Sequence, residues 1–189
     1  MNIIKEKNMG NLVVISGPSG AGKDSIIENL KKINKNFWVS ISMTTRAPRT
    51  GEVDGKSYFF VSKEEFEDNI KKDNFLEYAT YNGEYYGTPK SKILDKLQQG
   101  IDVILEIEIQ GALKIKEILP ETLFIFILPP SMNELKKRLI NRKTDSKEKI
   151  ISRFKRAYQE INEVTKYNYV VINDDLEDAT NKVNSILVS

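Results

Sequence analysis

Apolar residues occur along the chain in short runs that alternate with stretches of helical spacing. The runs are rich in β-branched and aliphatic side chains, as is typical of buried strands, and they cover residues 12–16, 37–42, 102–109, 123–128 and 169–173. In the connecting stretches apolar residues recur every three or four positions, as in residues 24–32, 91–99 and 131–141. This alternation predicts an α/β fold with about five parallel strands flanked by helices.

Residues 46–90 break the alternation, because they are rich in turn residues and aromatics. Two strand-like runs, 75–81 and 84–88, flank the dipeptide Asn82-Gly83, which is a strong hairpin signal. Ser62 and Glu65 have the spacing of a capping box and predict the start of a short helix. We therefore expect a small mixed or antiparallel insertion here.

Residues 129–162 form a second departure. A capping box at 131–134 opens a helix rich in Lys and Arg, which we expect to stop near residues 144–146 before a longer helix follows. The apolar face of the longer helix is predicted to consist of Ile150, Ile151, Phe154, Tyr158 and Ile161. The pattern predicts a helical hairpin that could move as a lid.

The composition excludes several kinds of catalytic and metal site but says little about the fold. The chain has 189 residues, no Cys and no His, which excludes disulfides, thiolate zinc sites, Ser-His-Asp triads and imidazole bases. Charged residues make up 30% and the net charge is only +2, a balance that argues against a dedicated nucleic-acid or membrane-surface binder. The longest apolar run has six residues and residues 1–9 are polar, so we expect a cytoplasmic protein.

Arginine is sparse and falls in two groups. Of the 29 basic residues only six are Arg, at positions 46, 49, 138, 142, 153 and 156. In a chain that uses Lys as its general surface cation, Arg marks places that need a planar, bidentate donor, such as phosphate sites. Chance clustering explains the count equally well until the motifs are considered.

The strongest local motif is a glycine-rich loop after the first strand. Its residues are Gly17, Pro18, Ser19, Gly20, Ala21, Gly22 and Lys23. In this strand–loop–helix context backbone N–H groups can surround phosphate oxygens while the lysine reaches the β and γ phosphates, so the motif predicts an ATP site.

The residue after the lysine departs from the usual pattern. A P-loop normally has Ser or Thr there as a magnesium ligand, whereas this chain has Asp24. Asp24 could bind Mg²⁺ through a carboxylate oxygen, point away as a favourable charge in the first helical turn, or repel the γ-phosphate. The sequence leaves these three alternatives open.

Two further segments carry candidate chemistry. Arg46 and Arg49, with hydroxyls before them and Tyr58 beyond, could converge on a second phosphate. In the strand predicted over residues 102–109, alternation places Glu106 and Glu108 on one face. A carboxylate near the end of such a strand is placed to hold Mg²⁺ through water, and Glu106 is the candidate.

From about Gly10 onward the chain closely resembles the guanylate kinase family, and the segment from Thr44-Thr45-Arg46 to Phe60-Val61 matches the signature of that family. The resemblance implies a P-loop kinase fold and transfer of a phosphoryl group from ATP to GMP (and dGMP), with Mg²⁺, for purine nucleotide metabolism. It implies one domain over residues 10–189, with a core of 10–42, 91–128 and 163–189, a GMP-binding insertion of 43–90 and a lid of 129–162. Residues 1–9 would be an N-terminal extension.

The resemblance also implies roles for individual residues. The GMP phosphate would be held by Arg46, Arg49, Tyr58 and Tyr86, and guanine would be read by Ser42, Glu77 and Thr88. Guanine offers two adjacent N–H donors that one carboxylate can accept together, whereas adenine lacks this pair. Glu108 would lie near the acceptor, and residues 173–175 match the segment near adenine.

Lid arginines complete the implied site. Arg138, Arg142 and Arg153 match residues that close over the triphosphate and, with Lys23 and Arg46, stabilise its developing charge. Arg156 has a simpler explanation, an exposed helix face with Glu160 four residues later. Lys143 occupies a position where the family usually has Gly.

Two other functions remain compatible with the sequence. One is a related kinase with another acceptor, against which Ser42, Glu77 and Thr88 argue. The other is a guanylate-kinase-like binding module of the kind found in scaffolding proteins, and Asp24 is its best support. We expect ATP and GMP as the partners, without nucleic acid or membrane, and a monomer or homodimer.

Overall fold

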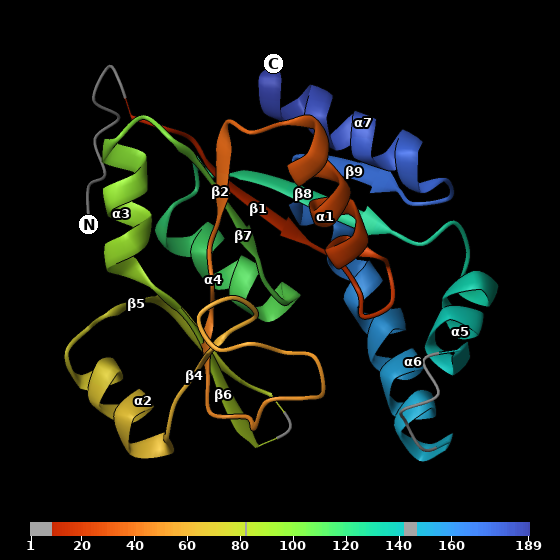
Figure 1. Cartoon of the computed structure of the whole chain (residues 1–189). Helices are drawn as coiled ribbons and strands as arrows, with labels where there is room; N and C mark the ends of the chain where they lie inside the picture. Colours follow the sequence, from red (N-terminus) through yellow and green to blue (C-terminus); the bar gives the residue numbers. More distant parts are fainter. Residues whose placement is uncertain (1–8, 82, 142–146) are drawn as a thin grey trace. The chain divides into compact units, whose positions relative to one another are not determined.

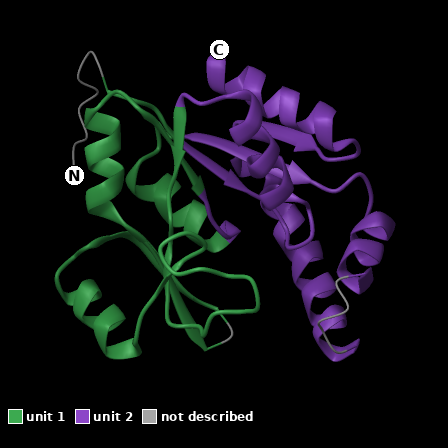
Figure 2. Ribbon diagram, viewed as in Figure 1, with its two compact units in different colours: residues 1–12, 37–105, 110–122 green, residues 13–36, 106–109, 123–189 purple. Residues whose placement is uncertain are grey.

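The computed structural model describes residues 9–81, 83–141 and 147–189 of the chain (Figure 1). It divides into two compact units. Unit 1 consists of residues 1–12, 37–105 and 110–122, and unit 2 of residues 13–36, 106–109 and 123–189 (Figure 2). Asn82, Arg142, Lys143 and the expected helix stop at 144–146 lie outside the described residues, as does most of the expected extension.

The larger sheet has five strands, as the sequence predicts, and the pairings recorded within it are parallel. In sheet order these are β2 (Phe37–Val39), β7 (Asp102–Glu106), β1 (Leu12–Ser16), β8 (Leu123–Leu128) and β9 (Tyr169–Ile172). β1 and β8 have the predicted bounds, because both are long apolar runs ended by turn residues. Apart from Leu12, Leu123 and Leu128 at their ends, their side chains are buried, as both faces of a parallel sheet require.

Three predicted strands are too long, one of them, over 169–173, by a single residue, because β9 ends at Ile172. β2 ends at Val39 rather than at residue 42, and the chain forms the separate short strand β3 (Met43–Thr44) four residues later. β7 ends at Glu106 rather than at residue 109. There the backbone N–H of Ile107 still donates to the carbonyl of Ile15 at 3.4 Å, but Ile109 already begins helix α4 (Ile109–Ile118).

The smaller sheet lies in unit 1 and is mixed. Its order is β4 (Phe59–Phe60), β3, β6 (Glu84–Pro89) and β5 (Phe75–Tyr81). β3 and β4 are parallel, while β6 pairs antiparallel with both β3 and β5. The predicted β5–β6 hairpin is confirmed by the pairing of Tyr81 with Glu84. Helix α2 (Lys63–Lys71) begins at the predicted cap, where the Ser62 hydroxyl accepts from the backbone N–H of Glu65 at 3.1 Å.

Aromatic packing holds the small sheet against α2. Phe66 is fully buried and stacks between Phe75 and Tyr85, with ring centroids 4.4 and 5.1 Å away. Helix α3 (Lys90–Gln98) follows β6 directly and begins one residue before the predicted position.

In unit 2, helices α1 (Lys23–Ile33) and α7 (Leu176–Val188) contact one another, and α7 also contacts β9 (Figure 1). The predicted hairpin consists of α5 (Met132–Asn141) and α6 (Lys147–Ile161), which pack through Leu135, Leu139 and Ala157. A short 3-10 turn, η1 (Asn162–Lys166), follows.

The predicted apolar face of α6 is partly wrong. Ile150 and Phe154 pack on the α5–α6 core as expected, but Ile151 and Tyr158 are 56% and 64% exposed. A helix face continues every three or four residues, so the buried line runs through 150, 154 and 157 and leaves 151 and 158 to one side. None of the helices in the described residues has the length and apolar character needed to cross a bilayer.

Candidate active site

The glycine-rich loop joins β1 to α1 in unit 2, as its sequence predicts. Its turn needs glycine at three points, since Gly17, Gly20 and Gly22 have φ angles of +151°, +92° and +91°. A Cβ at Gly22 would lie only 2.3 Å from Nδ2 of Asn173. In the described part of the chain no side chain caps α1, so the N–H groups of its first turn remain available to an anion.

Two side chains brace this loop. The ammonium group of Lys23 donates to the carbonyl of Gly17 at 3.1 Å, so it lies folded over the loop. The amide of Asn173 donates to the carbonyl of Ala21 at 2.8 Å, and Asn173 is 5% exposed. The loop is therefore held in shape by its own unit before any phosphate binds.

Two arginines from the α5–α6 hairpin reach the same loop. Arg138 on α5 donates through Nη2 to the carbonyl of Asn173 at 3.1 Å and through Nη1 to the carbonyl of Ala21 at 3.5 Å. Arg153 on α6 donates to the hydroxyl of Ser19 at 2.6 Å. The structure thus brings Lys23, Arg138 and Arg153 to one loop, while Arg142 lies outside the described residues.

A pair of carboxyl groups lies beside the loop lysine. The pKa of Glu106 is raised to about 8, mainly by burial, and further by the hydrogen bond and the negative charge of Asp24. The positive charge of Lys23 works against this rise. Glu106 ends β7 and Asp24 lies in the first turn of α1, so Asp24 points toward the carboxylate rather than away from the site.

This pair suits a hard cation that is bound mainly by other oxygens. Mg²⁺ usually takes one or two protein carboxylates, several waters and substrate phosphates. Within the described residues no cluster of three or more Asp, Glu, His or Cys side chains forms a cage. Two carboxyl groups beside a phosphate loop therefore fit Mg²⁺ that arrives with a nucleotide.

Glu108 does not share a strand face with Glu106, so that prediction is wrong. β7 has already ended, Glu108 is exposed, and it forms an ion pair with Arg156 at 3.4 Å. Arg156 also pairs with Glu160 at 2.6 Å, so the expected partner is confirmed. The expectation of an exposed helix face is wrong, because the side chains of Arg156 and Glu160 are only 33% and 11% exposed. Asp175 caps α7 by accepting from the N–H of Asp178 at 2.9 Å.

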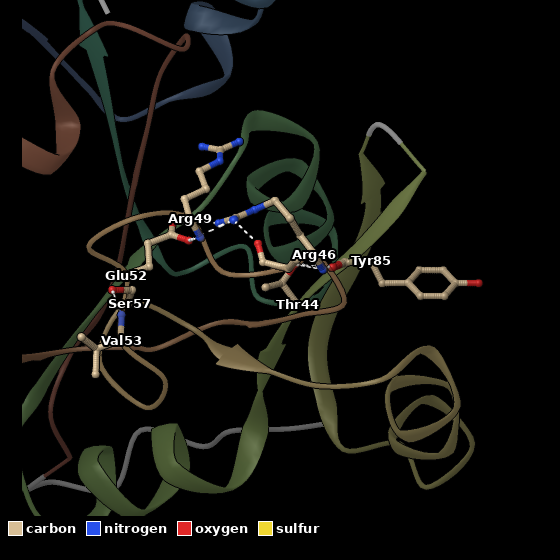
Figure 3. A network of polar contacts seen from close by, with 8 residues as sticks. Thr44, Arg46, Arg49, Glu52, Val53, Ser57 and Tyr85 are labelled. Atoms are coloured by element: carbon tan, nitrogen blue, oxygen red, sulfur yellow. Dashed lines mark hydrogen bonds and ion pairs between the residues drawn. The ribbon is translucent and has the colours of Figure 1, made fainter. Parts of the chain in front are cut away.

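The second arginine group lies in unit 1 and is organised by Glu52. Both Nη atoms of Arg46 donate to the Glu52 carboxylate, at 2.8 and 2.9 Å, and the backbone N–H of Arg49 donates to it at 2.7 Å (Figure 3). Figure 3 shows the Arg49 guanidinium extending away from Glu52. The pKa of Glu52 is lowered, chiefly by its hydrogen bond with Arg46.

Two tyrosines accompany Arg46. Its guanidinium lies 5.4 Å from the ring centroid of Tyr58, and the Tyr58 and Tyr86 rings meet edge to face at 6.1 Å. The pKa of Arg46 is raised, first by the Glu52 hydrogen bond and also by Tyr86. The structure therefore gathers Arg46, Tyr58 and Tyr86 as the sequence predicts.

The third group is a buried carboxyl–hydroxyl pair on the mixed sheet of unit 1. Glu77 and Thr88 are direct partners in the β5–β6 pairing, and the Thr88 hydroxyl donates to Oε1 of Glu77 at 2.7 Å. Burial is the main cause that raises the pKa of Glu77, while Thr88 and Lys114 oppose the rise. Ser42 is positioned by its carbonyl, which accepts from the N–H of Phe59 at 2.9 Å. Within the described residues no recorded contact joins Ser42 to Glu77.

Sequence reasoning missed the supporting residues. Glu52 belongs to the Arg46 segment but carries no predicted role, and Asn173 was assigned only by resemblance to a segment near adenine. The signal for Asn173 is a polar residue directly after the apolar strand β9. Glu52 gives no comparable signal, since Gly and Glu are ordinary in a surface loop.

Comparisons with known proteins agree over nearly the whole chain. Residues 9–189 match the family model described as guanylate kinase. The guanylate kinase of Clostridium tetani is 60% identical over 94% of this chain and 85% of its own length. That of Caldanaerobacter subterraneus subsp. tengcongensis is 58% identical over 97% and 89%. The crystal structure of guanylate kinase from Anaplasma phagocytophilum matches with a TM-score of 0.80 and 34% identity, over 96% of this chain and 86% of that one.

Proposed function

Because the chain belongs to the guanylate kinase family, we propose that it transfers the γ-phosphoryl group of ATP to GMP and produces ADP and GDP. The observation that carries the proposal for GMP is the buried Glu77–Thr88 pair, which lies on the mixed sheet. Tyr86 belongs to β6 of that sheet, and the Arg46 guanidinium and the Tyr58 ring lie next to each other just after β3 and just before β4. A base-recognising pair together with a phosphate-recognising group in one unit is what a nucleoside monophosphate requires.

Residues 17–24 would hold the ATP phosphates. The positive φ angles of the glycines, the uncapped start of α1 within the described residues and the folded Lys23 support this role. Arg138 and Arg153 already contact the loop, so they would lie beside the triphosphate and stabilise the charge that spreads over its oxygens. Arg142 would join them from the same hairpin.

Asp24 and Glu106 would hold Mg²⁺, partly through water. The two carboxyl groups share a hydrogen bond beside Lys23, and carboxylate oxygens are ligands that Mg²⁺ accepts. When bound, the ion neutralises charge on the β and γ phosphates. Of the alternatives for Asp24, its contact with Glu106 supports the role of a ligand. Glu108 is better explained by its ion pair with Arg156 than by a place near the acceptor.

Arg46, Arg49, Tyr58 and Tyr86 would hold the GMP phosphate. Arg46 is oriented by two hydrogen bonds to Glu52, and the guanidinium of Arg49 extends away from that carboxylate (Figure 3). The acceptor phosphate has a second pKa near 6 by analogy with phosphorylated side chains, so it is largely ionised at pH 7. It needs no imidazole base, in keeping with a chain that contains no His.

Glu77 would read guanine by accepting from N1–H and from the exocyclic amine, with Thr88 and Ser42 beside the base. The buried position of Glu77 makes this selective, because adenine would leave the carboxylate without its donors. Transfer would then be direct and in line. Positioning and electrostatics would supply the rate, with no covalent enzyme intermediate.

The proposal is tested by measuring ADP release from ATP with GMP, dGMP, AMP, CMP and UMP at several Mg²⁺ concentrations. We expect strong preference for GMP and dGMP, loss of activity without Mg²⁺, and at least a 100-fold lower kcat for Lys23→Ala. Equal turnover of AMP would refute the guanine assignment. Failure to release ADP with any acceptor would refute the kinase assignment.

The remaining expectations are also proposals. We infer that the 43–90 insertion binds GMP and that the 129–162 hairpin is a lid, supported by the mixed sheet within the former and the arginines of the latter. ATP and GMP as substrates support a cytoplasmic enzyme that needs neither nucleic acid nor membrane. A monomer or homodimer stays a prediction, which light scattering would test.

A further inference from the structure

The carboxylate of Glu77 is held on two sides by different means. On one side the hydroxyl of Thr88 donates to Oε1 at 2.7 Å. On the other side lies the backbone of Gly111, the third residue of helix α4. Both neighbours belong to unit 1, as Glu77 does. One side is therefore fixed by a hydrogen bond and the other by contact alone.

Gly111 has no conformational need to be glycine. Its φ angle is not among the positive ones, so its backbone suits any L-residue. Glycine inside a helix is about 0.5–1 kcal/mol less favourable than alanine. The space around it gives a different reason, because a Cβ added there would lie 2.7 Å from Oε2 and 3.0 Å from Cδ of Glu77.

The nearest atoms that this Cβ would meet all belong to the carboxyl group of Glu77. A side-chain end shifts more easily than a packed backbone, so α4 can keep its place while the carboxylate moves. A methyl group added at Gly111 would therefore move the Glu77 carboxylate off its position while helix α4 keeps its place.

We propose that Gly111 is a specificity-determining position, whose missing side chain lets the Glu77 carboxylate sit where it accepts both N–H donors of guanine. The proposal rests on the proposed function, because it requires that Glu77 reads the base. Gly111 itself does not touch the substrate and acts by positioning Glu77.

The test compares wild type with Gly111→Ala by steady-state kinetics with GMP and with IMP, which lacks the exocyclic amine. We expect the KM for GMP to rise at least about 10-fold, because a misplaced acceptor loses one of two hydrogen bonds. The KM for ATP and the melting temperature should stay near those of wild type. The preference for GMP over IMP should fall at least about 5-fold, since IMP has only one donor to lose.

A double-mutant cycle with Glu77→Ala separates this cause from a general disturbance of α4. Once the carboxylate is gone, Gly111→Ala should change the KM for GMP by less than twofold. Gln110→Ala is the matched control on the same helix, because Gln110 is an exposed neighbour of Gly111 in α4, and its KM for GMP should be unchanged. If Gly111→Ala does not fold, the double variant with Glu77→Ala should fold.

Three outcomes would overturn the proposal. They are a GMP KM within twofold of wild type for Gly111→Ala, an equal rise in the Glu77→Ala background, or failure of both variants to fold. Failure of the proposed function is distinguishable, because wild type itself would then not phosphorylate GMP.

Discussion

The Glu77 carboxyl group shows how one residue connects recognition with stability. Burial raises its pKa above the usual range for Glu, so the folded chain binds a proton there more tightly than the unfolded chain does. Stability contributed by this group therefore falls as pH rises from the ordinary Glu range through the raised pKa. In the proposed function, the ionised carboxylate is the form that would accept the two N–H groups of guanine.

Glu77→Gln should accordingly improve stability while it harms activity. At pH 8 we expect a higher melting temperature than wild type, because no charge is buried, and near pH 4 the advantage should disappear. The KM for GMP should rise at least about 10-fold, since an amide cannot accept both donors. Calorimetry at the two pH values measures the first effect. A variant less stable than wild type at pH 8 would contradict the assigned cost of burial.

Asp24 is the second residue whose role can be decided by one substitution. If it holds Mg²⁺ with Glu106, Asp24→Ser should shift the Mg²⁺ dependence of ADP release by about threefold or more. The KM for GMP should not change, and Asp24→Asn serves as a control of equal size. An unchanged Mg²⁺ dependence would refute the role of Asp24 as a magnesium ligand.

At the scale of elements, the P-loop depends on contacts from distant parts of the chain. The Asn173 amide donates to the carbonyl of Ala21, 152 residues away in the sequence. Because of this separation, no local sequence pattern predicts the hydrogen bond. Gly22 leaves room for this amide, with an added Cβ only 2.3 Å from Nδ2. The loop therefore requires glycine for its φ angle and also for its neighbour.

Gly22→Ala should lower the free energy of unfolding by about 1–3 kcal/mol, because it adds both strain and a collision. In the double variant Gly22→Ala/Asn173→Ala the Asn173 amide is gone. The added methyl group should then cost only the free energy that is due to backbone strain. Urea unfolding of the four proteins in the cycle measures the two parts. Strict additivity would show that the amide and the methyl group do not meet.

The elements that sequence predicts well are those set by local pattern. β1 and β8 have the predicted bounds because long apolar runs end at Gly or Pro. The strand predicted over 102–109 was too long, because Ile107 and Ile109 continue an alternation although Ile109 already belongs to α4. The site could not be predicted in full from local pattern. The hydrogen bonds of Arg46 with Glu52 and the close approach of Gly111 to Glu77 are tertiary contacts.

At the scale of the whole molecule, the proposed ATP residues belong to unit 2 and the proposed GMP residues to unit 1. Each group is braced by contacts inside its own unit, such as Asn173 on the P-loop and Glu52 on Arg46. Substitutions in one group should therefore leave binding by the other group intact.

Thermal shifts with single nucleotides test this independence. A nucleotide at 100 times its Kd stabilises the folded chain by about 2.7 kcal/mol, which is roughly 5–10 °C for a chain of this size. Lys23→Ala should lose the shift with ATP and keep that with GMP, whereas Arg46→Ala should do the reverse. Loss of both shifts in either variant would contradict separate binding groups.

The pairing of Arg46 with Glu52 also limits how a phosphate can approach. A guanidinium carries five N–H groups in a fixed plane. In Arg46 two of them donate to Glu52 and one to the carbonyl of Ala47, and Tyr86 is a further side-chain hydrogen-bond partner. The N–H groups that face neither Glu52 nor Ala47, on Nε and Nη2, point along a single edge of the plane. Glu52 thereby leaves one edge of the Arg46 guanidinium for an anion, so a phosphate bound there, as we propose for GMP, would be oriented as it binds.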